Sequence, residues 1–254
     1  MKITKMHGLQ NDFVVVDEPF SADPFLVEHL CDRRTGVGAD GVLAVGRRGD
    51  HVTMRYWNAD GSEAEMCGNG LRCVARYAVA HGLASGPNMV VDTPVGERQA
   101  RVGEGVVEVE LGPVAVGDAV VIEGREYRRA SVGNPHAVTT VEDPDLVDVA
   151  GLGRRVETDP QFPAGTNVEF MAITGPDAIR LRVWERGVGE TRACGTGMAA
   201  AASVARTTLG VPEIEVGVPG GIGRVRFDGE IAWLSGPAEF VFEATWPAPV
   251  SEPS

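Results

Sequence analysis

The stretch Cys67-Gly68-Asn69-Gly70 has a second copy in Cys194-Gly195-Thr196-Gly197. The same shift of 127 residues, the spacing of Cys67 and Cys194, aligns further segments in the same order. They are Arg55-Tyr56-Trp57 with Arg182-Val183-Trp184, Glu63 with Glu190, and Gly38-Ala39-Asp40 with Gly165-Thr166-Asn167. With small length changes, Val91-Asp92-Thr93-Pro94 also matches Val216-Gly217-Val218-Pro219, and Gly112-Pro113 matches Gly236-Pro237. This internal repeat predicts two similar domains, residues 1–116 and 117–238, with a short linker near Gly117.

Each half is predicted to be mostly β-structure with one prominent helix. Apolar spacing predicts helices over residues 70–81 and 196–209, closed by Gly82 and Gly210. Asp23-Pro24 is a typical start for a further helix, an N-cap followed by proline in the first turn. Strands are expected at 12–17, 41–46, 51–57, 90–91, 99–102 and 106–111, the last two forming a hairpin around residues 103–105. The pattern indicates an α+β fold.

Cys67 and Cys194 each stand immediately before a predicted helix. A helix N-terminus carries unpaired N–H groups and positive potential, which favour anions and stabilise a thiolate. The glycines of each copy let a ligand approach the backbone closely. If the two domains face each other across a pseudo-twofold axis, both thiols converge on one cleft. Such a pair suits inversion of an amino-acid α-carbon, because a thiolate removes the proton from one face while a thiol delivers another to the opposite face.

The other two cysteines, Cys31 and Cys73, lie on predicted helices and are interpreted as small buried apolar residues. None of the four cysteines forms a Cys-x-x-Cys pair, so structural zinc is not expected. Cysteines this sparse do not indicate a secreted disulfide scaffold. A disulfide between Cys67 and Cys194 is interpreted as an oxidised artefact, not a structural tie.

Composition limits the classes of partner. The chain has 254 residues, 43% of them hydrophobic, and a formal net charge of -13. That charge argues against nucleic-acid binding, which needs a basic face. No apolar run approaches the roughly 20 residues of a membrane-spanning helix. These features are typical of an acidic cytoplasmic protein with reduced thiols.

Seven stretches together resemble one family, that of diaminopimelate epimerase, along nearly the whole chain. They are residues 6–13 (Met6-His7-Gly8-Leu9-Gln10-Asn11-Asp12-Phe13), 58–63, 66–70, 133–136 (Gly133-Asn134-Pro135-His136), 166–170, 185–191 and 193–197. The resemblance implies two pseudo-symmetric mixed-β domains, each wrapped around a central helix, with the active site between them. It also implies that a last strand, at about 239–248, returns to complete the first domain, and that the protein forms a homodimer.

The implied reaction is the interconversion of L,L- and meso-diaminopimelate in lysine and peptidoglycan precursor synthesis, without pyridoxal phosphate or metal. Cys67 and Cys194 would be the catalytic acid and base. Backbone N–H groups of the two helix starts would hold the reacting α-carboxylate, at Gly68, Asn69, Gly195 and Thr196. Further side chains would contact the substrate: Asn11, Asn58, Asn167 and Arg186 at the distal centre, Glu185 with the Arg186 backbone at the reacting ammonium, and Asn134 and His136 near the cysteines.

Two positions depart from the commoner family pattern. Gln10 replaces a glycine often found before the Asn-Asp-Phe segment, and Gly41 stands where several members carry glutamine. Both changes concern substrate contacts, not the thiols. Two other functions stay open from the residues: a proline or hydroxyproline racemase of the same fold, and a non-catalytic amino-acid binding protein. The four distal residues argue against the first, and two thiols in mirrored positions argue against the second.

Overall fold

The computed structural model describes residues 1–64 and 66–247. The elements of the first half are β1 (Lys2–Gly8), β2 (Asn11–Asp17), α1 (Pro24–Cys31), β3 (Gly41–Arg48), β4 (His51–Asn58), β5 (Glu63–Ala64), α2 (Gly68–Ala80), β6 (Asn88–Thr93), β7 (Gly96–Val102) and β8 (Val107–Pro113). Those of the second half are β9 (Ala115–Ile122), β10 (Arg125–Ser131), β11 (Pro135–Thr140), the 3-10 turn η1 (Pro144–Leu146), α3 (Val149–Glu157), β12 (Asn167–Ile173), β13 (Ala178–Glu185), β14 (Gly189–Thr191), α4 (Gly195–Leu209), β15 (Glu213–Val218), β16 (Gly221–Asp228) and β17 (Ile231–Gly236). The last strand is β18 (Glu239–Thr245).

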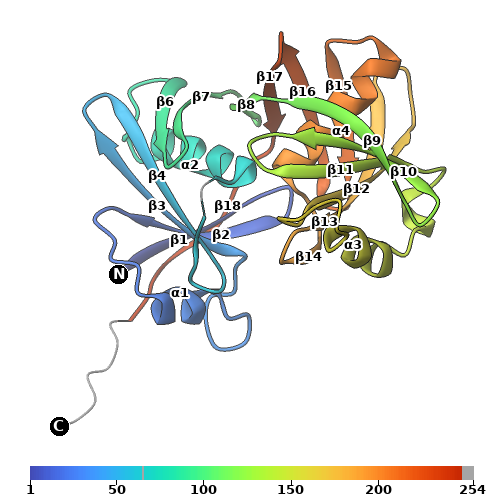
Figure 1. Ribbon diagram of the computed structural model, residues 1–254. Coiled ribbons are helices and arrows are strands. Elements are labelled where there is room, and N and C mark those ends of the chain that lie inside the picture. The colour runs from blue at the N-terminus through green and yellow to red at the C-terminus, as the bar shows by residue number, and fades with distance from the viewer. Residues whose placement is uncertain (65, 248–254) are drawn as a thin grey trace.

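The two halves repeat one sheet topology. In the first half the strands pair in the order β18-β1-β2-β3-β4-β6-β7-β8. In the second half the order is β9-β10-β11-β12-β13-β15-β16-β17. The parallel pairs fall at equivalent places, β2 with β3 and β4 with β6, then β11 with β12 and β13 with β15. An antiparallel pairing of β8 with β17 joins the halves. The repeat in the sequence is therefore a repeat of structure (Figure 1).

Each half is completed by a strand that follows the other half in the chain. β9 follows β8 but pairs with β10, and β18 follows β17 but pairs with β1. The return of β18 was expected, although the end of the predicted strand, at residue 248, lies outside the described residues. The linker expected near Gly117 is wrong, because Gly117 lies inside β9. The exact domain boundaries stay a prediction, and the pairing of β9 favours a division before Ala115.

The two central helices lie within their sheets, as predicted (Figure 1). Leu71, Val74, Ala75 and Ala78 form a buried face of α2, and Gly210 closes α4 with a left-handed backbone. Helix α2 begins two residues before the predicted start, because the Cys67 side chain caps it by accepting a hydrogen bond from Gly70 N–H. The run Ala199–Ala202 is fully buried, and such small side chains let α4 pack closely against its sheet.

Helix α3 was not predicted. It begins at the N-cap Asp148 and occupies the place in the second half that α1 occupies in the first. Gly151 and Gly153 weaken its helix signal, since glycine is a poor helix former. A Cβ on Gly153 would lie 2.5 Å from the Trp184 Cβ, so the glycine lets the helix lie flat against β13. Tertiary packing, and not local propensity, therefore stabilises this helix.

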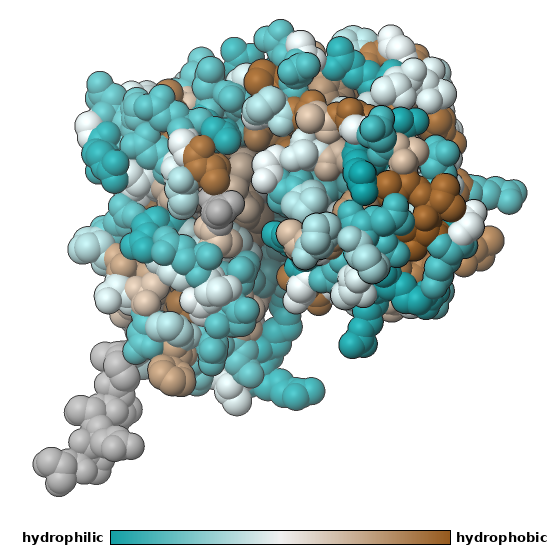
Figure 2. Space-filling view, in the orientation of Figure 1, coloured by the Kyte–Doolittle hydropathy of each residue, from teal (hydrophilic) through white to brown (hydrophobic). Residues whose placement is uncertain are grey.

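The surface is hollowed between the two halves on the face shown in Figure 2. Over that face as a whole, most exposed side chains are hydrophilic. None of the helices in the described residues is both long enough and apolar enough to span a membrane.

Candidate active site

The N-termini of α2 and α4 meet where the two halves join. A Cβ on Gly195 would lie 3.2 Å from the Gly68 Cα and 3.5 Å from the Asn69 backbone nitrogen. A Cβ on Gly68 would in turn lie 3.6 Å from the Gly195 Cα. The two helix starts are thus in backbone contact, which the absence of side chains allows. Cys67 and Cys194, the N-cap residues, flank this junction.

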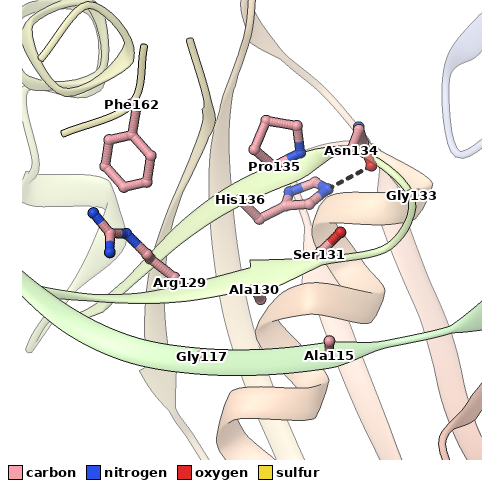
Figure 3. A pocket seen from close by; sticks show the side chains of 10 residues that line it. All are labelled: Ala115, Gly117, Arg129, Ala130, Ser131, Gly133, Asn134, Pro135, His136 and Phe162. Atoms are coloured by element: carbon pink, nitrogen blue, oxygen red, sulfur yellow. Dashed lines mark hydrogen bonds between the residues drawn. The ribbon is translucent and has the colours of Figure 1, made fainter. Parts of the chain in front are cut away.

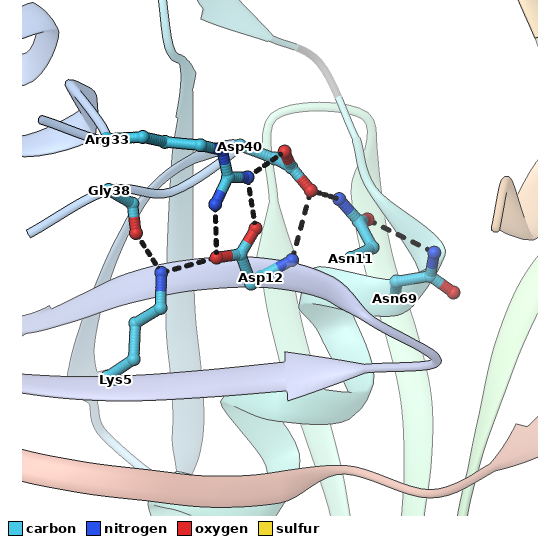
Figure 4. Close-up of polar contacts among 7 residues, drawn as sticks. All are labelled: Lys5, Asn11, Asp12, Arg33, Gly38, Asp40 and Asn69. Carbon is cyan, nitrogen blue, oxygen red and sulfur yellow. Dashed lines mark hydrogen bonds and ion pairs between the residues drawn. The ribbon is translucent and has the colours of Figure 1, made fainter. Parts of the chain in front are cut away.

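We call the polar residues around the first thiol the Cys67 frame: Cys67, Asn11, Asn69 and Arg72. The Cys67 sulfur accepts a hydrogen bond from Gly70 N–H at 3.3 Å and lies 3.6 Å from the Asn11 Oδ1. Asn11 Nδ2 donates to the Asp40 carboxylate at 2.7 Å, as Figure 4 shows. Because a carboxylate only accepts, this bond fixes the Asn11 amide with its oxygen toward the thiol.

Behind Asn11 lies a network of charges that positions Asp40. Arg33 donates to Asp12 at 2.7 Å and to Asp40 at 2.8 Å, and Lys5 donates to Asp12 at 2.6 Å (Figure 4). Burial alone would raise the pKa of Asp12, but the hydrogen bonds and charges of Arg33 and Lys5 lower that pKa to about 2. These opposite charges make the strand start at Asn11 rigid.

The Asn69 side chain connects the two halves. Its Nδ2 donates to Asn11 Oδ1 at 3.1 Å and to the backbone carbonyl of Ala193 at 3.0 Å, directly before Cys194. Its Oδ1 accepts a hydrogen bond from Arg72 Nη2 at 2.9 Å. Asn69 is therefore held on both sides and spans the junction of the helix starts.

The Cys194 frame consists of Cys194, Asn134, Thr196 and Glu185. The Cys194 sulfur accepts from Gly197 N–H at 3.4 Å and lies 3.5 Å from Thr196 Oγ1, to which Asn134 Nδ2 donates at 3.4 Å. Burial, and then the negative charge of Glu185, raise the pKa of Cys194 well above its ordinary value. Burial also raises the pKa of Glu185, which accepts a 2.5 Å hydrogen bond from Thr191 Oγ1.

A buried pair, His136 and Glu169, supports the Cys194 frame. Both side chains are fully buried, and His136 Nδ1 lies 2.6 Å from Glu169 Oε1. The other ring nitrogen lies 3.0 Å from Asn134 Oδ1, as Figure 3 shows. Burial raises the pKa of Glu169 despite the opposing effect of His136. His136 thus fixes the orientation of the Asn134 amide. Both residues line a cavity of about 380 Å³, together with Arg129 and Phe162.

The remaining predicted residues lie at strand ends and make contacts of their own. Asn167 Oδ1 accepts from the Arg186 backbone N–H at 3.0 Å, and Arg186 Nη1 donates to the Ala164 carbonyl at 3.0 Å. Asn58 ends β4 and donates to Ser62 Oγ at 3.1 Å. Within the described residues, neither Asn58 nor Arg186 forms a hydrogen bond with Cys67 or Cys194. Asn58 and Glu185 are 127 residues apart, so they occupy equivalent places in the two halves.

A cavity of about 540 Å³ opens between the halves beside Asn11. The first half contributes His7, Gln10, Asn11, Asp12, Arg33 and Asp40 to its wall, and the second half contributes Val188, Glu190, Thr191, Arg192 and Ala193. The polar network of Figure 4 therefore faces an opening large enough for a small molecule.

Three residues of this site were missed from the sequence: Asp40, Arg72 and Glu169. Glu169 had a usable signal, because it interrupts the apolar run of the buried strand β12. Asp40 matched Asn167 in the repeat, but its hydrogen bond to Asn11 is a contact between distant segments. Arg72 gave no signal, since a charged residue on a helix is usually exposed.

The two departures from the family pattern have structural explanations. A Cβ on Gly41 would lie 2.3 Å from the Trp57 carbonyl oxygen and 2.5 Å from Tyr56 Cε2, so the tyrosine ring occupies the adjacent space. Burial, followed by the charges of Cys67 and Glu185, raises the pKa of Tyr56. Gln10 has a φ of 64°, the left-handed region that favours glycine.

Comparison with known proteins identifies one family, and the relatives with similar sequences have the same name. Residues 3–116 and 129–241 match the family described as diaminopimelate epimerase. A diaminopimelate epimerase of Nitrosomonas europaea is 40% identical, with 96% of this chain and 98% of the relative covered. One of Alkalilimnicola ehrlichii is 41% identical, with 96% and 97% covered.

Solved structures with low sequence identity share the fold. A phenazine biosynthesis protein of the PhzF family from Bacillus anthracis superposes with a TM-score of 0.76 at 14% identity, covering 96% of this chain and 98% of that one. A hydroxyproline epimerase from Agrobacterium vitis superposes with a TM-score of 0.70 at 16% identity, covering 96% and 91%.

Proposed function

The chain belongs to the diaminopimelate epimerase family, and we propose that it performs the family's reaction with Cys67 and Cys194 as the paired acid and base. It is an isomerase that interconverts L,L- and meso-diaminopimelate, in lysine and peptidoglycan precursor biosynthesis. The residue roles below are our proposal.

The contact of the two helix starts at Gly68 and Gly195 is the observation that supports this proposal most directly. It brings two N-cap cysteines, each from an equivalent position of the repeat, to one junction. Epimerisation needs one group on each face of the α-carbon, and a pair related by pseudo-twofold symmetry provides that arrangement. The thiolate removes the α-proton, the thiol on the opposite face donates its own proton to the carbanion, and the two roles exchange in the reverse direction.

The helix starts also suit the charge that develops during the reaction. We propose that backbone N–H groups of Gly68, Asn69, Gly195 and Thr196 hold the reacting carboxylate, since a helix N-terminus favours an anion. As the α-proton leaves, negative charge spreads into that carboxylate, and donors already in place stabilise it.

The remaining polar residues divide between the two ends of the substrate in this proposal. Glu185, next to Cys194, would pair with the reacting ammonium together with the backbone of Arg186. Asn134 and His136 would shape the pocket near Cys194, where their mutual hydrogen bond supports them. Asn11, Asn58, Asn167 and the Arg186 side chain would recognise the distal, unreacting centre, where amides and a fixed charge select a second ammonium–carboxylate end.

Proton NMR of L,L-diaminopimelate with the reduced protein in heavy water tests the reaction. We expect loss of the α-proton signal together with appearance of the meso isomer. No exchange with verified free thiols would contradict the substrate assignment, and proline and hydroxyproline would then be tested as racemase substrates. Saturable binding without exchange would instead identify an amino-acid binding protein.

We further propose a cytoplasmic homodimer. A cytoplasmic location suits the chemistry, because the reducing cytosol keeps both thiols free. Strand β18 supports a dimer: within the described residues it pairs only with β1, and Phe240, Val241 and Phe242 on it are 40%, 53% and 45% exposed. An exposed apolar edge strand is a common site of association. Light scattering after size-exclusion chromatography tests this, and a monomer at micromolar concentration would contradict it.

A further inference from the structure

Arg72 is a charged residue in the middle of the protein core. Its side chain is fully buried on helix α2, five residues after Cys67. The equivalent position in α4, 127 residues later, is Ala199. Arginine is almost never fully buried without an acidic partner, because removing its charge from water is costly. The equivalent helix α4 has alanine at this position, so the fold itself does not require the charge.

The contacts of Arg72 do not compensate for this cost. Nη2 donates to Asn69 Oδ1 at 2.9 Å, and Nε donates to the Pro237 carbonyl at 3.4 Å. Nη1 is buried without a hydrogen-bond partner in the part of the chain that the structure describes. No carboxylate among the described residues forms an ion pair with this guanidinium. Gly8 and Gly236 make room for it, since a Cβ on Gly8 would lie 3.0 Å from Nη2.

The hydrogen bond to Asn69 determines how that amide is oriented. A guanidinium only donates, so Asn69 must present its oxygen to Arg72 and its NH₂ group to the opposite side. The NH₂ group then donates to Asn11 Oδ1 and to the Ala193 carbonyl. With the amide reversed, two donors would face each other at Arg72. Arg72, together with the Ala193 carbonyl, therefore fixes the orientation of Asn69, a side chain that spans the junction of the two helix starts.

The charge of Arg72 also acts on the thiol of Cys67. The pKa of Cys67 is raised to about 11: burial raises it most and Glu185 raises it too, whereas the hydrogen bonds from the Gly70 and Asn69 backbone and the charge of Arg72 lower it. Burial lowers the pKa of Arg72 to about 10, and the neighbouring Cys73 and Cys67 oppose that change. Negative charge on Cys67 also raises the pKa values of Tyr56 and Cys73, after the larger effect of burial. The guanidinium is thus charged at neutral pH, and its charge opposes the effects of burial and of Glu185 on the Cys67 thiol.

We propose that Arg72 is a positioning residue of the reaction, whose buried cation favours the thiolate on Cys67 and whose hydrogen bond fixes Asn69 between the two cysteine frames. This inference rests on the proposed role of Cys67. It gives the pseudo-symmetric site a direction, because the cation acts on one thiol and has no counterpart at the other.

Alkylation of the reduced protein by iodoacetamide, followed from pH 6.5 to 10.5 and assigned to each cysteine by peptide mass spectrometry, tests the proposal. Arg72→Met removes the charge at similar volume, Arg72→Gln removes it but keeps a donor, and Arg72→Lys keeps the charge but loses the planar fork. In the Met and Gln variants we expect Cys67 alkylation at pH 8 to slow by about tenfold or more, which corresponds to a pKa increase of about one unit. Cys194 alkylation should stay within about twofold in every variant, since the cation has no counterpart in its frame.

The Lys variant separates the two effects of Arg72. It should keep the Cys67 titration near that of the wild type but lose about tenfold in α-proton exchange, because the Asn69 oxygen loses the guanidinium donor that helps to orient it. An unchanged Cys67 profile in the Met and Gln variants would overturn the proposal. So would equal changes at both cysteines, which would indicate general loosening of the fold. Wild-type protein that stays active after complete Cys67 alkylation would instead contradict the catalytic role of Cys67, and it would leave the titration result standing.

Discussion

Cys67 begins its helix beside two amides and a buried arginine, whereas Cys194 begins an equivalent helix beside a glutamate and a buried His136–Glu169 pair. The two frames have the same backbone topology, and each cysteine sulfur accepts a hydrogen bond from the backbone N–H three residues later. The side chains at equivalent places differ: Asn69 and Thr196, Arg72 and Ala199, Asn58 and Glu185, Asp40 and Asn167. The repeat thus accounts for the shared framework, and the side chains that differ account for the chemistry of each frame.

This difference has a chemical meaning. A reaction that inverts a centre needs symmetric placement of two thiols but opposite protonation states, thiolate on one side and thiol on the other. Glu185 disfavours negative charge at both thiols, whereas Arg72 opposes that effect at Cys67 and Glu169 adds to it at Cys194. The backbone supplies the symmetry, and the surrounding charges supply the asymmetry.

Removal of either thiol should have the largest effect. Cys67→Ala and Cys194→Ala should each reduce epimerisation by roughly a thousandfold, since each removes one of two proton-transfer groups. The rate is measured by NMR with L,L-diaminopimelate. Cys31→Ala is the control, because it deletes a buried thiol from α1 and should leave the rate near that of the wild type. A substantial residual rate in only one of the two variants would break the pairing of the frames.

The two glycines at the contact of the helix starts should differ in their sensitivity to substitution by alanine. In Gly195→Ala the new Cβ would lie 3.2 Å from the Gly68 backbone, whereas in Gly68→Ala the closest atom, at 2.9 Å, is the movable Leu111 side chain. We expect Gly195→Ala to lose roughly 1 to 3 kcal/mol of stability and tenfold or more in rate, and Gly68→Ala to lose less.

Urea unfolding and α-proton exchange of both variants measure the two losses. Gly86→Ala is the matched control, because nothing lies within 4 Å of its added Cβ. Equal effects at Gly68 and Gly195 would contradict the prediction that backbone contact makes Gly195 the more sensitive position.

The comparison of frames also shows what a sequence can reveal about this protein. The repeat predicted two halves with one central helix each, because Cys-Gly-x-Gly and the apolar spacing after it are local signals. It also predicted the cysteine pair, since both copies lie at equivalent positions. The last strand was anticipated from the family resemblance.

What the sequence could not show depends on contacts between distant segments. Helix α3 contains two glycines and is stabilised by packing on Trp184, so its local signal is weak. Strand β9 follows the first half in the chain but pairs with the second, and Gly117 therefore resembled a linker. Arg72 and Asp40 act through Asn69 and Asn11, and nothing in their own neighbourhoods of the sequence indicates those partners.

Acid titration distinguishes the polar groups that support the two frames. Asp12 occupies the strand position equivalent to His136, and Arg33 and Lys5 hold its pKa at about 2 against the effect of burial. Because the folded pKa lies below the ordinary value of 3.8, Asp12 stabilises the protein above pH 3.8, and this contribution is lost as pH falls toward 2. After allowance for solvent screening, the contribution is roughly 1 to 2 kcal/mol.

Asp12→Asn should therefore be less stable than the wild type at pH 7 and should lose less stability between pH 5 and pH 2. Urea unfolding at a series of pH values measures the difference between the two proteins. Asp50→Asn, at a fully exposed aspartate, is the control and should follow the wild type. Parallel curves for Asp12→Asn and the wild type would contradict a stabilising role of the Arg33 and Lys5 contacts.

The turns that precede β2 and β11 give the smallest predicted effect. In the first half Leu9 and Gln10 have φ values of 55° and 64°, whereas the equivalent turn of the second half has Gly133, with φ 89°. Glutamine in this region is strained, and glycine is not. Gln10→Gly should stabilise the folded protein, but glycine also makes the unfolded chain more flexible, so the net gain is at most about 1 kcal/mol. Gln10→Ala keeps a Cβ in the same conformation and should show no gain. A decrease in the thermal midpoint of Gln10→Gly relative to Gln10→Ala would mean that the turn holds no strain, and that the two halves differ here in sequence but not in energy.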